Sequence, residues 1–150
     1  MLSMLRTDAA HPDFIALVRL LDAELAERDG SEHDFYHQFN GIANIKHAVV
    51  CYEGSTPAGC GAIKAFSTDA MEVKRMFTRP DYRGKGVARA VLTELEHWAA
   101  ELGFEKCVLE TGKKQPEAIA LYQKCGYAQT PNYGQYVGIE NSLCFEKAVR

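Results

Sequence analysis

Six stretches of the chain combine short apolar runs with an alternation of apolar and polar residues, which is the pattern of β-strands. They cover residues 2–6, 47–53, 60–66, 70–78, 106–111 and 141–147. The turn-forming sequence GSTPAG, residues 54–59, separates the second stretch from the third. Because the second, third and fourth stretches follow one another with short connections, they predict an antiparallel meander.

Three further stretches repeat apolar residues at intervals of three and four, which is the pattern of amphipathic helices. The expected bounds are Pro12 to Gly30, Gly84 to Gly103 and Pro116 to Gly126. Proline is common in the first turn of a helix, and glycine is common just after the last turn. A shorter helix is expected within residues 31–46, where aromatic and polar residues mix. The resulting order of strands and helices predicts one α+β domain over residues 1–150, built on a mixed sheet.

Composition and charge narrow the class of protein. The chain has 150 residues, of which 47% are hydrophobic, so it can bury one substantial core. The formal net charge is −3 and the two signs are interspersed, which argues against a nucleic-acid-binding protein with a strongly basic face. No apolar run approaches the roughly 18 residues that a membrane span needs. These features predict a protein that binds neither nucleic acid nor membrane.

The cysteines and histidines bear on the compartment and on metal binding. The five cysteines lack CxxC spacing: Cys51, Cys60, Cys107, Cys125 and Cys144. Buried free thiols in a reducing cytoplasm explain this odd number better than a disulfide framework or a zinc site. His33 and His37 are four residues apart, but no acidic ligand of a known pattern adjoins them. We therefore expect a cytoplasmic protein without a bound metal.

The segment RGKGVAR, from Arg83 to Arg89, has the composition of a phosphate-binding helix start. Gly84 and Gly86 flank Lys85 where the first turn of the second long helix is expected. A helix start leaves backbone N–H groups unpaired and carries the positive end of the helix dipole, and glycine has no Cβ to keep a bulky anion away. The basic side chains of this segment add positive charge. The alternative is a glycine-rich turn with solvated cations.

RGKGVA, residues 83–88, resembles the Q/R-x-x-G-x-G/A motif of the GCN5-related N-acetyltransferase (GNAT) family. EVKRMFTRPDYRGKGVARAVL, residues 72–92, resembles the fourth strand and third helix of that family, and PEAIALYQKCGY, residues 116–127, resembles its fourth helix and the next strand. The resemblance implies a central mixed, mostly antiparallel sheet flanked by about four helices. It also implies a V-shaped splay between the fourth and fifth strands, in which acetyl-coenzyme A is held.

The resemblance further implies which residues contact coenzyme A. Its pyrophosphate is expected to accept hydrogen bonds from the backbone amides of Gly84, Lys85, Gly86, Val87 and Ala88. The pantetheine arm is expected to pair with the backbone of Met76, Phe77 and Thr78. Gln115 stands seven residues before Tyr122, where the family often has an asparagine, and its longer side-chain amide could still bond the cofactor.

Acetyl transfer to an amine needs a base and an acid. An alkylammonium group with a pKa near 10.4 is neutral only about one part in 10³ at pH 7, and a general base removes that handicap. Glu72 lies eleven residues before Arg83, where several family members carry their basic glutamate. Tyr122 matches the tyrosine that often protonates the coenzyme A thiolate. The alternatives are a solvent-facing carboxylate paired with Lys74 or Lys64, and an aromatic residue that only fills the core.

Two segments rich in aromatic residues are expected to bind the acceptor. They are HDFYHQFN, residues 33–40, and TPNYGQYVG, residues 130–138, where family members vary most. The candidates for a mostly aromatic pocket are Phe35, Tyr36, Asn40, Tyr133 and Tyr136. Glu110, at the end of the fifth predicted strand, could hold a substrate ammonium. Ordinary loop packing is the alternative for the tyrosines.

These features together predict an N-acetyltransferase that transfers an acetyl group from acetyl-coenzyme A to a primary amine of a small molecule or amino acid. The amine would attack directly in a ternary complex. The identity of the acceptor and the occurrence of a homodimer stay open. Two other functions also stay open: an acyl-coenzyme A sensor or interaction module without turnover, and nucleotide-phosphate binding through residues 84–88.

Overall fold

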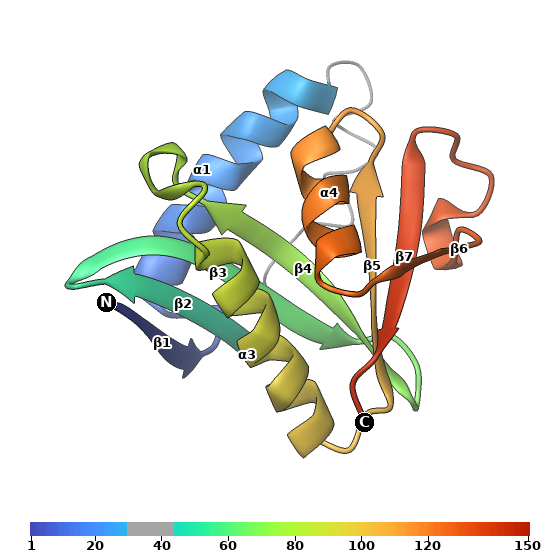
Figure 1. Ribbon diagram of the computed structural model, residues 1–150, viewed down its shortest axis with the longest axis horizontal. Coiled ribbons are helices and arrows are strands. Elements are labelled where there is room, and N and C mark those ends of the chain that lie inside the picture. The colour runs from blue at the N-terminus through green and yellow to red at the C-terminus, as the bar shows by residue number, and fades with distance from the viewer. Residues whose placement is uncertain (30–43) are drawn as a thin grey trace. The chain divides into compact units, whose positions relative to one another are not determined.

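The computed structural model describes residues 1–29 and 44–150 (Figure 1). The elements are β1 (Leu2–Thr7), α1 (Pro12–Asp29), β2 (His47–Glu53), β3 (Thr56–Ala65), β4 (Ala70–Thr78), the 3₁₀ helix η2 (Pro80–Tyr82), α3 (Val87–Glu101), β5 (Lys106–Gly112), α4 (Pro116–Lys124), β6 (Ala128–Thr130), the 3₁₀ helix η3 (Gly134–Tyr136) and β7 (Ser142–Ala148). The predicted order of the long helices and strands is confirmed. The short helix expected within residues 31–46 falls almost wholly outside the described residues.

The strands form one seven-stranded sheet in the order β1-β2-β3-β4-β5-β7-β6. The β1–β2, β2–β3, β5–β7 and β6–β7 pairs are antiparallel. The β4–β5 pair is parallel, and its ladder joins Ala70–Glu72 to Lys106–Val108. The predicted α+β class with a mixed, mostly antiparallel sheet is therefore confirmed, and it contains the parallel pair at which the resemblance places the splay.

The turn between β2 and β3 is shorter than the sequence predicts. A turn is expected over residues 54–59, but only Gly54 and Ser55 form it, and Thr56 already pairs with Glu53 across the two strands. Gly54 has a φ of 60°, which suits a tight hairpin connection. Two residues are enough to reverse the chain, so the rest of the turn-like sequence joins β3.

The described residues form two compact units. The first contains residues 1–64 and 74–95, and the second contains residues 65–73 and 96–150. β4 and α3 each contribute residues to both units. Among the described helices, none has the length and apolar character needed to span a membrane.

In the first unit, α1 and α3 cover opposite faces of the strands (Figure 1). The face under α1 forms a buried cluster with residues from the helix and three strands: Phe14, Leu17, Val18, Leu21, Ala48, Val50, Cys60, Ala62 and Phe77. The four helical members recur at intervals of three and four residues, so the apolar stripe predicted for this helix faces the sheet.

On the opposite face, two glycines of β3 allow α3 and β4 to approach closely. A Cβ atom on Gly59 would lie 2.8 Å from the carbonyl oxygen of Phe77 and 2.6 Å from Cγ1 of Val87. A Cβ atom on Gly61 would lie 2.9 Å from Cγ1 of Val91. The backbone oxygen and the β-branched side chains have little freedom to move away. These glycines are therefore required by close packing.

We expect Gly59→Ala to lower the free energy of unfolding by about 1–3 kcal/mol, the usual cost of overpacking. The matched control is Gly112→Ala in β5, where the atom nearest to the new Cβ lies 3.6 Å away, an ordinary contact. The control should change the free energy of unfolding by about 0.5 kcal/mol or less. Denaturant unfolding of both variants measures the difference, and equal losses would contradict the packing argument.

In the second unit, β5 and β7 present two faces of different character. Their register places Val108 opposite Glu146 and Leu109 opposite Phe145. Because side chains alternate along a strand, one face carries Lys106, Val108, Glu110, Cys144 and Glu146, and we call it the loop face. The other face carries Cys107, Leu109, Phe145 and Lys147, and we call it the helix face. α4 packs on the helix face, where the ring of Tyr122 lies 6.4 Å from the ring of Phe145.

Candidate active site

The expected phosphate cradle lies at the start of α3. Gly84 and Gly86 have φ values of 79° and 84°, and a Cβ atom on either residue would meet no other atom within 4 Å. The N–H of Ala90 bonds the carbonyl of Gly86 at 3.0 Å and begins the helical pattern. The amides just before Ala90 therefore precede the first helical bond, as at any helix start. Open space beside two glycines and unpaired helical amides fits the pyrophosphate of coenzyme A.

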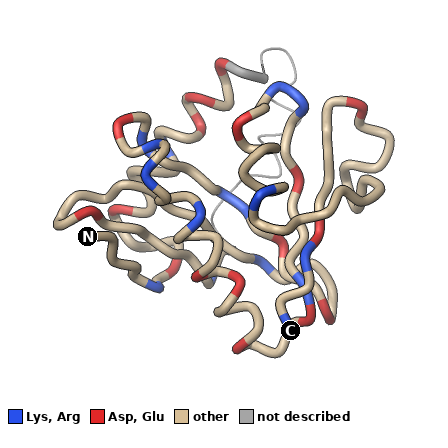
Figure 2. The backbone as a smooth tube through the Cα atoms, in the orientation of Figure 1, with Lys and Arg blue, Asp and Glu red and all other residues tan. Residues whose placement is uncertain are grey.

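Lys and Arg positions recur along the backbone where the chain enters α3 (Figure 2). Arg83 donates from Nη2 to Glu24 of α1 at 2.8 Å and from Nε to the carbonyl of Thr78 at 2.9 Å. The Nζ atom of Lys85 lies 5.4 Å from the centroid of the Tyr82 ring. Because Arg83 already has an acidic partner, backbone amides are the main donors that this segment offers to an anion.

The residues expected to contact pantetheine lie in β4. Phe77 is buried in the cluster under α1, whereas Met76 and Thr78 are half-buried. Gln115 precedes the first turn of α4, and its side chain makes no capping hydrogen bond to that helix. The contacts of these four residues with the cofactor stay predictions.

Arg75 interrupts the ordinary backbone of β4. Its φ is 58°, and it is the only non-glycine residue in the described ranges with a positive φ. The buried guanidinium forms an ion pair with Asp22 of α1, and the Arg75 carbonyl accepts a bond from the Sγ of Cys60 at 3.4 Å. A non-glycine residue in this region costs about 1–2 kcal/mol, so these contacts hold it there. The strained residue stands three positions after Glu72, and the sequence carries no signal for it.

Glu72 is buried, which contradicts the solvent-facing position assumed in the alternative. Its exposed fraction is 7%. The hydroxyl of Tyr133 donates to Oε2 of Glu72 at 2.7 Å. The centroid of the Tyr133 ring lies 4.7 Å from the centroid of the Phe66 ring. The structure thus joins the expected base to a residue that the sequence suggested only for the acceptor pocket.

A cluster of acidic and phenolic groups surrounds Glu72. Burial, followed by the charge and hydrogen bond of Glu72, raises the pKa of Tyr133 above its ordinary value. Burial and the charges of Glu110 and Glu72 raise the pKa of Tyr136. Burial raises the pKa of the Cys144 thiol to about 11, and the same two carboxylates add to the rise. The structure therefore brings Glu72, Glu110, Tyr133 and Tyr136 into one electrostatic neighbourhood.

Tyr122 packs on the helix face, whereas Tyr133 contacts Glu72 on the loop face. It is buried on α4, and its ring packs edge-on against Tyr127 with 5.9 Å between centroids. Burial, followed by the charge of Glu110, raises the pKa of Tyr122 above its ordinary value. The phenol therefore keeps its proton through the neutral and mildly alkaline range, as an acid must. Its packing also agrees with the alternative of a core aromatic residue.

Asn132 fixes the segment that carries the two acceptor-site tyrosines. Its Nδ2 atom lies 3.1 Å from the carbonyl oxygen of Tyr136, 3.1 Å from that of Ile139 and 3.0 Å from that of Ser142. An amide NH₂ has two hydrogens, so the three acceptors share them. Sequence reasoning did not single out Asn132, although asparagine in a loop often bonds nearby backbone.

Some expected site residues lie outside the described part of the chain. They are Phe35, Tyr36 and Asn40, the first half of the expected acceptor pocket, together with His33 and His37. The acceptor site can therefore be built from its second half, the segment after β6.

Comparison with known proteins places the chain in a family. The model of the "Acetyltransferase (GNAT) family" matches residues 14–127. A protein of Azospirillum brasilense named IAA acetyltransferase is 41% identical over 137 residues, which are 89% of this chain and 88% of that protein. A Bacillus subtilis protein, the uncharacterized N-acetyltransferase YsnE, is 35% identical over 64% of this chain and 65% of its own length.

Solved structures agree with this assignment. A Klebsiella pneumoniae protein, proposed to be an acyl-CoA N-acyltransferase, has a TM-score of 0.84 and 26% identity, and the match covers 100% of this chain and 99% of that one. A GNAT family acetyltransferase of Elizabethkingia anophelis, solved with acetyl-CoA bound, shares the fold with a TM-score of 0.68, at 16% identity over 98% of this chain and 97% of that one. The chain therefore belongs to the GNAT family of acetyltransferases and is an enzyme of that class.

Proposed function

We propose that this enzyme transfers the acetyl group of acetyl-coenzyme A to a primary amine of a small molecule or amino acid. The amine would attack directly, with both substrates bound. Acetyl-coenzyme A supplies the reactive thioester. The protein would bind the donor, remove a proton from the acceptor and return a proton to the sulfur.

The start of α3 supports the binding of the donor. The open space beside Gly84 and Gly86, together with the unpaired amides that precede Ala90, suits a diphosphate. Backbone donors aimed at one place bind an anion without the entropic cost of ordering long side chains. Arg83, Lys85 and Arg89 would add charge around that contact.

The burial of Glu72 and its bond to Tyr133 are the observations that carry the proposal. A carboxylate at 7% exposure is shielded from bulk water and held in one orientation by the Tyr133 hydroxyl. Such a group can take a proton from an acceptor ammonium, directly or through one water molecule. Glu110, which lies on the same face, would help to attract that ammonium.

The position and protonation of Tyr122 support the last step. The phenol is protonated at neutral pH, so it has a proton to give to the departing sulfur. The base candidate contacts the loop-face residue Tyr133, whereas Tyr122 packs on the helix face beside Phe145.

The proposal is tested by measuring thiol release from acetyl-coenzyme A against a panel of amines and amino acids, followed by mass spectrometry of the products. IAA belongs in the panel because the Azospirillum brasilense relative is named for it. Acetylated amine supports the proposal. Tight binding of coenzyme A without any acetylated product across the panel would contradict it and favour a sensor.

We expect Glu72→Gln to slow single turnover by about tenfold to a hundredfold near neutral pH, the lower part of the range for a general base. The loss should shrink as pH rises, because the amine then loses its proton without help. The amide oxygen can still accept the Tyr133 bond, so folding should be preserved. Rapid-quench rates across pH measure the effect.

Tyr133→Phe is the matched control for that variant, because it removes the same hydrogen bond and keeps the carboxylate. It should keep a pH-dependent limb, because the carboxylate remains, whereas Glu72→Gln should lose that limb. A Glu72→Gln profile that coincides with the wild-type profile would remove Glu72 from the proposed role.

A further inference from the structure

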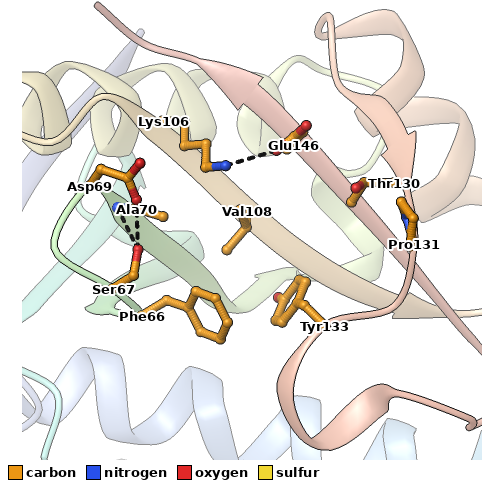
Figure 3. A pocket seen from close by; sticks show the side chains of 10 residues that line it. All are labelled: Phe66, Ser67, Asp69, Ala70, Lys106, Val108, Thr130, Pro131, Tyr133 and Glu146. Atoms are coloured by element: carbon orange, nitrogen blue, oxygen red, sulfur yellow. Dashed lines mark hydrogen bonds and ion pairs between the residues drawn. The ribbon is translucent and has the colours of Figure 1, made fainter.

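A pocket of about 160 Å³ opens on the loop face of the second unit. Its wall is formed by Phe66, Ser67, Asp69, Ala70, Lys106, Val108, Thr130, Pro131, Tyr133 and Glu146. Figure 3 shows the rings of Phe66 and Tyr133 on one side of Val108, and the side chains of Lys106 and Glu146 on the other. The pocket therefore has an aromatic wall and a charged wall, with an apolar side chain between them.

The pocket adjoins the carboxylate proposed as the base. Tyr133 lines the pocket with its ring and donates its hydroxyl to Glu72 at 2.7 Å. Val108, another lining residue, is the direct partner of Glu72 in the β4–β5 ladder. Ala70 precedes Glu72 by two positions, so the side chains of both project from the same side of β4. An acceptor with its amine at Glu72 can thus extend its other end into the pocket.

The charges of the pocket favour a cation. Two carboxylates, Asp69 and Glu146, line it against one ammonium, that of Lys106. Lys106 is already paired with Glu146 at 3.1 Å, so the carboxylate of Asp69 leaves an excess of negative charge. That carboxylate accepts a hydrogen bond from the Ser67 hydroxyl at 2.7 Å, which orients it without neutralising it.

The aromatic wall favours the same kind of ligand. The faces of aromatic rings attract cations, and alkyl segments pack against them. The rings of Phe66 and Tyr133 meet at an angle of 60° with their centroids 4.7 Å apart, and Phe66 is 42% exposed. Asp69 lies in the bend just before β4, and Glu72 follows it by three positions on that strand, so the two carboxylates are close along the chain. A ligand with a cation at each end of a short aliphatic chain matches carboxylates at two neighbouring places.

We propose that this pocket selects diamine acceptors: it holds the non-reacting ammonium of a short aliphatic diamine between Asp69 and the Phe66–Tyr133 rings while the other amino group is acetylated at Glu72. The inference rests on the proposed function, because it names the acceptor class of that site. In the reaction the free amine forms a bond to the acetyl carbon, the carbon–sulfur bond breaks, the amine proton passes to Glu72 and the sulfur takes a proton from Tyr122. The second ammonium keeps its charge throughout.

The test uses three four-carbon acceptors that differ in one end group: putrescine ends in an ammonium, butylamine in a methyl group and γ-aminobutyrate in a carboxylate. We expect kcat/KM to be about tenfold higher for putrescine than for butylamine, and lowest for γ-aminobutyrate. The preference for putrescine should weaken as salt is added, because the pocket is open to solvent.

Two variants connect the preference to the pocket. Asp69→Asn keeps an oxygen for the Ser67 hydroxyl but removes the excess charge, so the putrescine-to-butylamine ratio should fall toward one. Lys106→Met removes the competing ammonium, and the ratio should rise. Asp8→Asn, in the turn before α1, is the control and should leave the ratio at the wild-type value.

The outcomes separate the two proposals. A preference for γ-aminobutyrate, or a ratio that Asp69→Asn leaves unchanged, overturns the diamine inference while the proposed function stands. If the enzyme acetylates other amines but none of these three, the diamine inference is likewise overturned and the proposed function stands. Failure to acetylate any amine of the wider panel overturns the proposed function and this inference with it.

Discussion

A Tyr122→Phe variant is expected to bind acetyl-coenzyme A like the wild-type protein and to turn it over about 10²-fold more slowly or worse. The change removes one oxygen from a buried ring that packs against Tyr127 and Phe145, so the shape of the helix face is kept. What it removes is a proton donor whose pKa is raised by burial and by Glu110. Without it the thiolate must leave unprotonated or take a proton from water.

The matched control for this prediction is Tyr127→Phe, the same change in the neighbouring ring. Tyr127 is also buried, and burial is the first cause of its raised pKa. It is not placed to serve the sulfur in the proposed mechanism, so its variant should keep the wild-type rate. Single-turnover measurements are needed, since slow product release would hide a change in chemistry. Equal rates for the two variants would show that Tyr122 only fills the core.

The second large effect is expected at the start of α3, where Gly86→Val should weaken coenzyme A binding by about 10²-fold or more. The branched side chain would fill the open space beside a backbone with a φ of 84°. It would displace the diphosphate from amide donors, and each lost hydrogen bond to a charged group costs about 1.5–3 kcal/mol. Isothermal calorimetry with coenzyme A measures the affinity.

A control must separate the effect of backbone strain in Gly86→Val from the effect of filling the space beside Gly86. Gly103→Val offers the comparison, because Gly103 has a φ of 93° and its Cβ would also meet no other atom within 4 Å. Both variants should lose similar stability in thermal unfolding, about 1–2 kcal/mol for a β-branched residue with positive φ. Only Gly86→Val should lose the ligand. If it binds coenzyme A normally, the cradle is not where the diphosphate lies.

Much of the fold could be predicted from the sequence because periodic patterns are local. The sequence predicts a strand over residues 70–78, and β4 has these bounds. Gly103 and Gly126 follow the last turns of their helices with φ values of 93°, as the rule for helix ends predicts. The length of the turn before β3 was not predicted correctly, because a run of turn-forming residues does not determine how many of them form the turn.

The candidate site was less predictable because it depends on contacts between distant parts of the chain. The hydrogen bond between Tyr133 and Glu72 joins residues 61 positions apart, and no local pattern encodes it. Glu72 is also buried, which the alternation of residues along the strand does not reveal. The close packing of Gly59 and Gly61 is a further contact of this kind, since their neighbours are side chains of α3 and atoms of β4.

The three carbonyl bonds of Asn132 have a consequence for how this enzyme could change over evolutionary time. The side-chain amide holds the backbone around Tyr133 and Tyr136 through bonds that involve neither phenol. Mutations at these two positions can therefore alter which acceptor fits while the loop keeps its path. A lineage could explore new acceptors by single substitutions, without passing through unfolded intermediates, as long as Asn132 is retained.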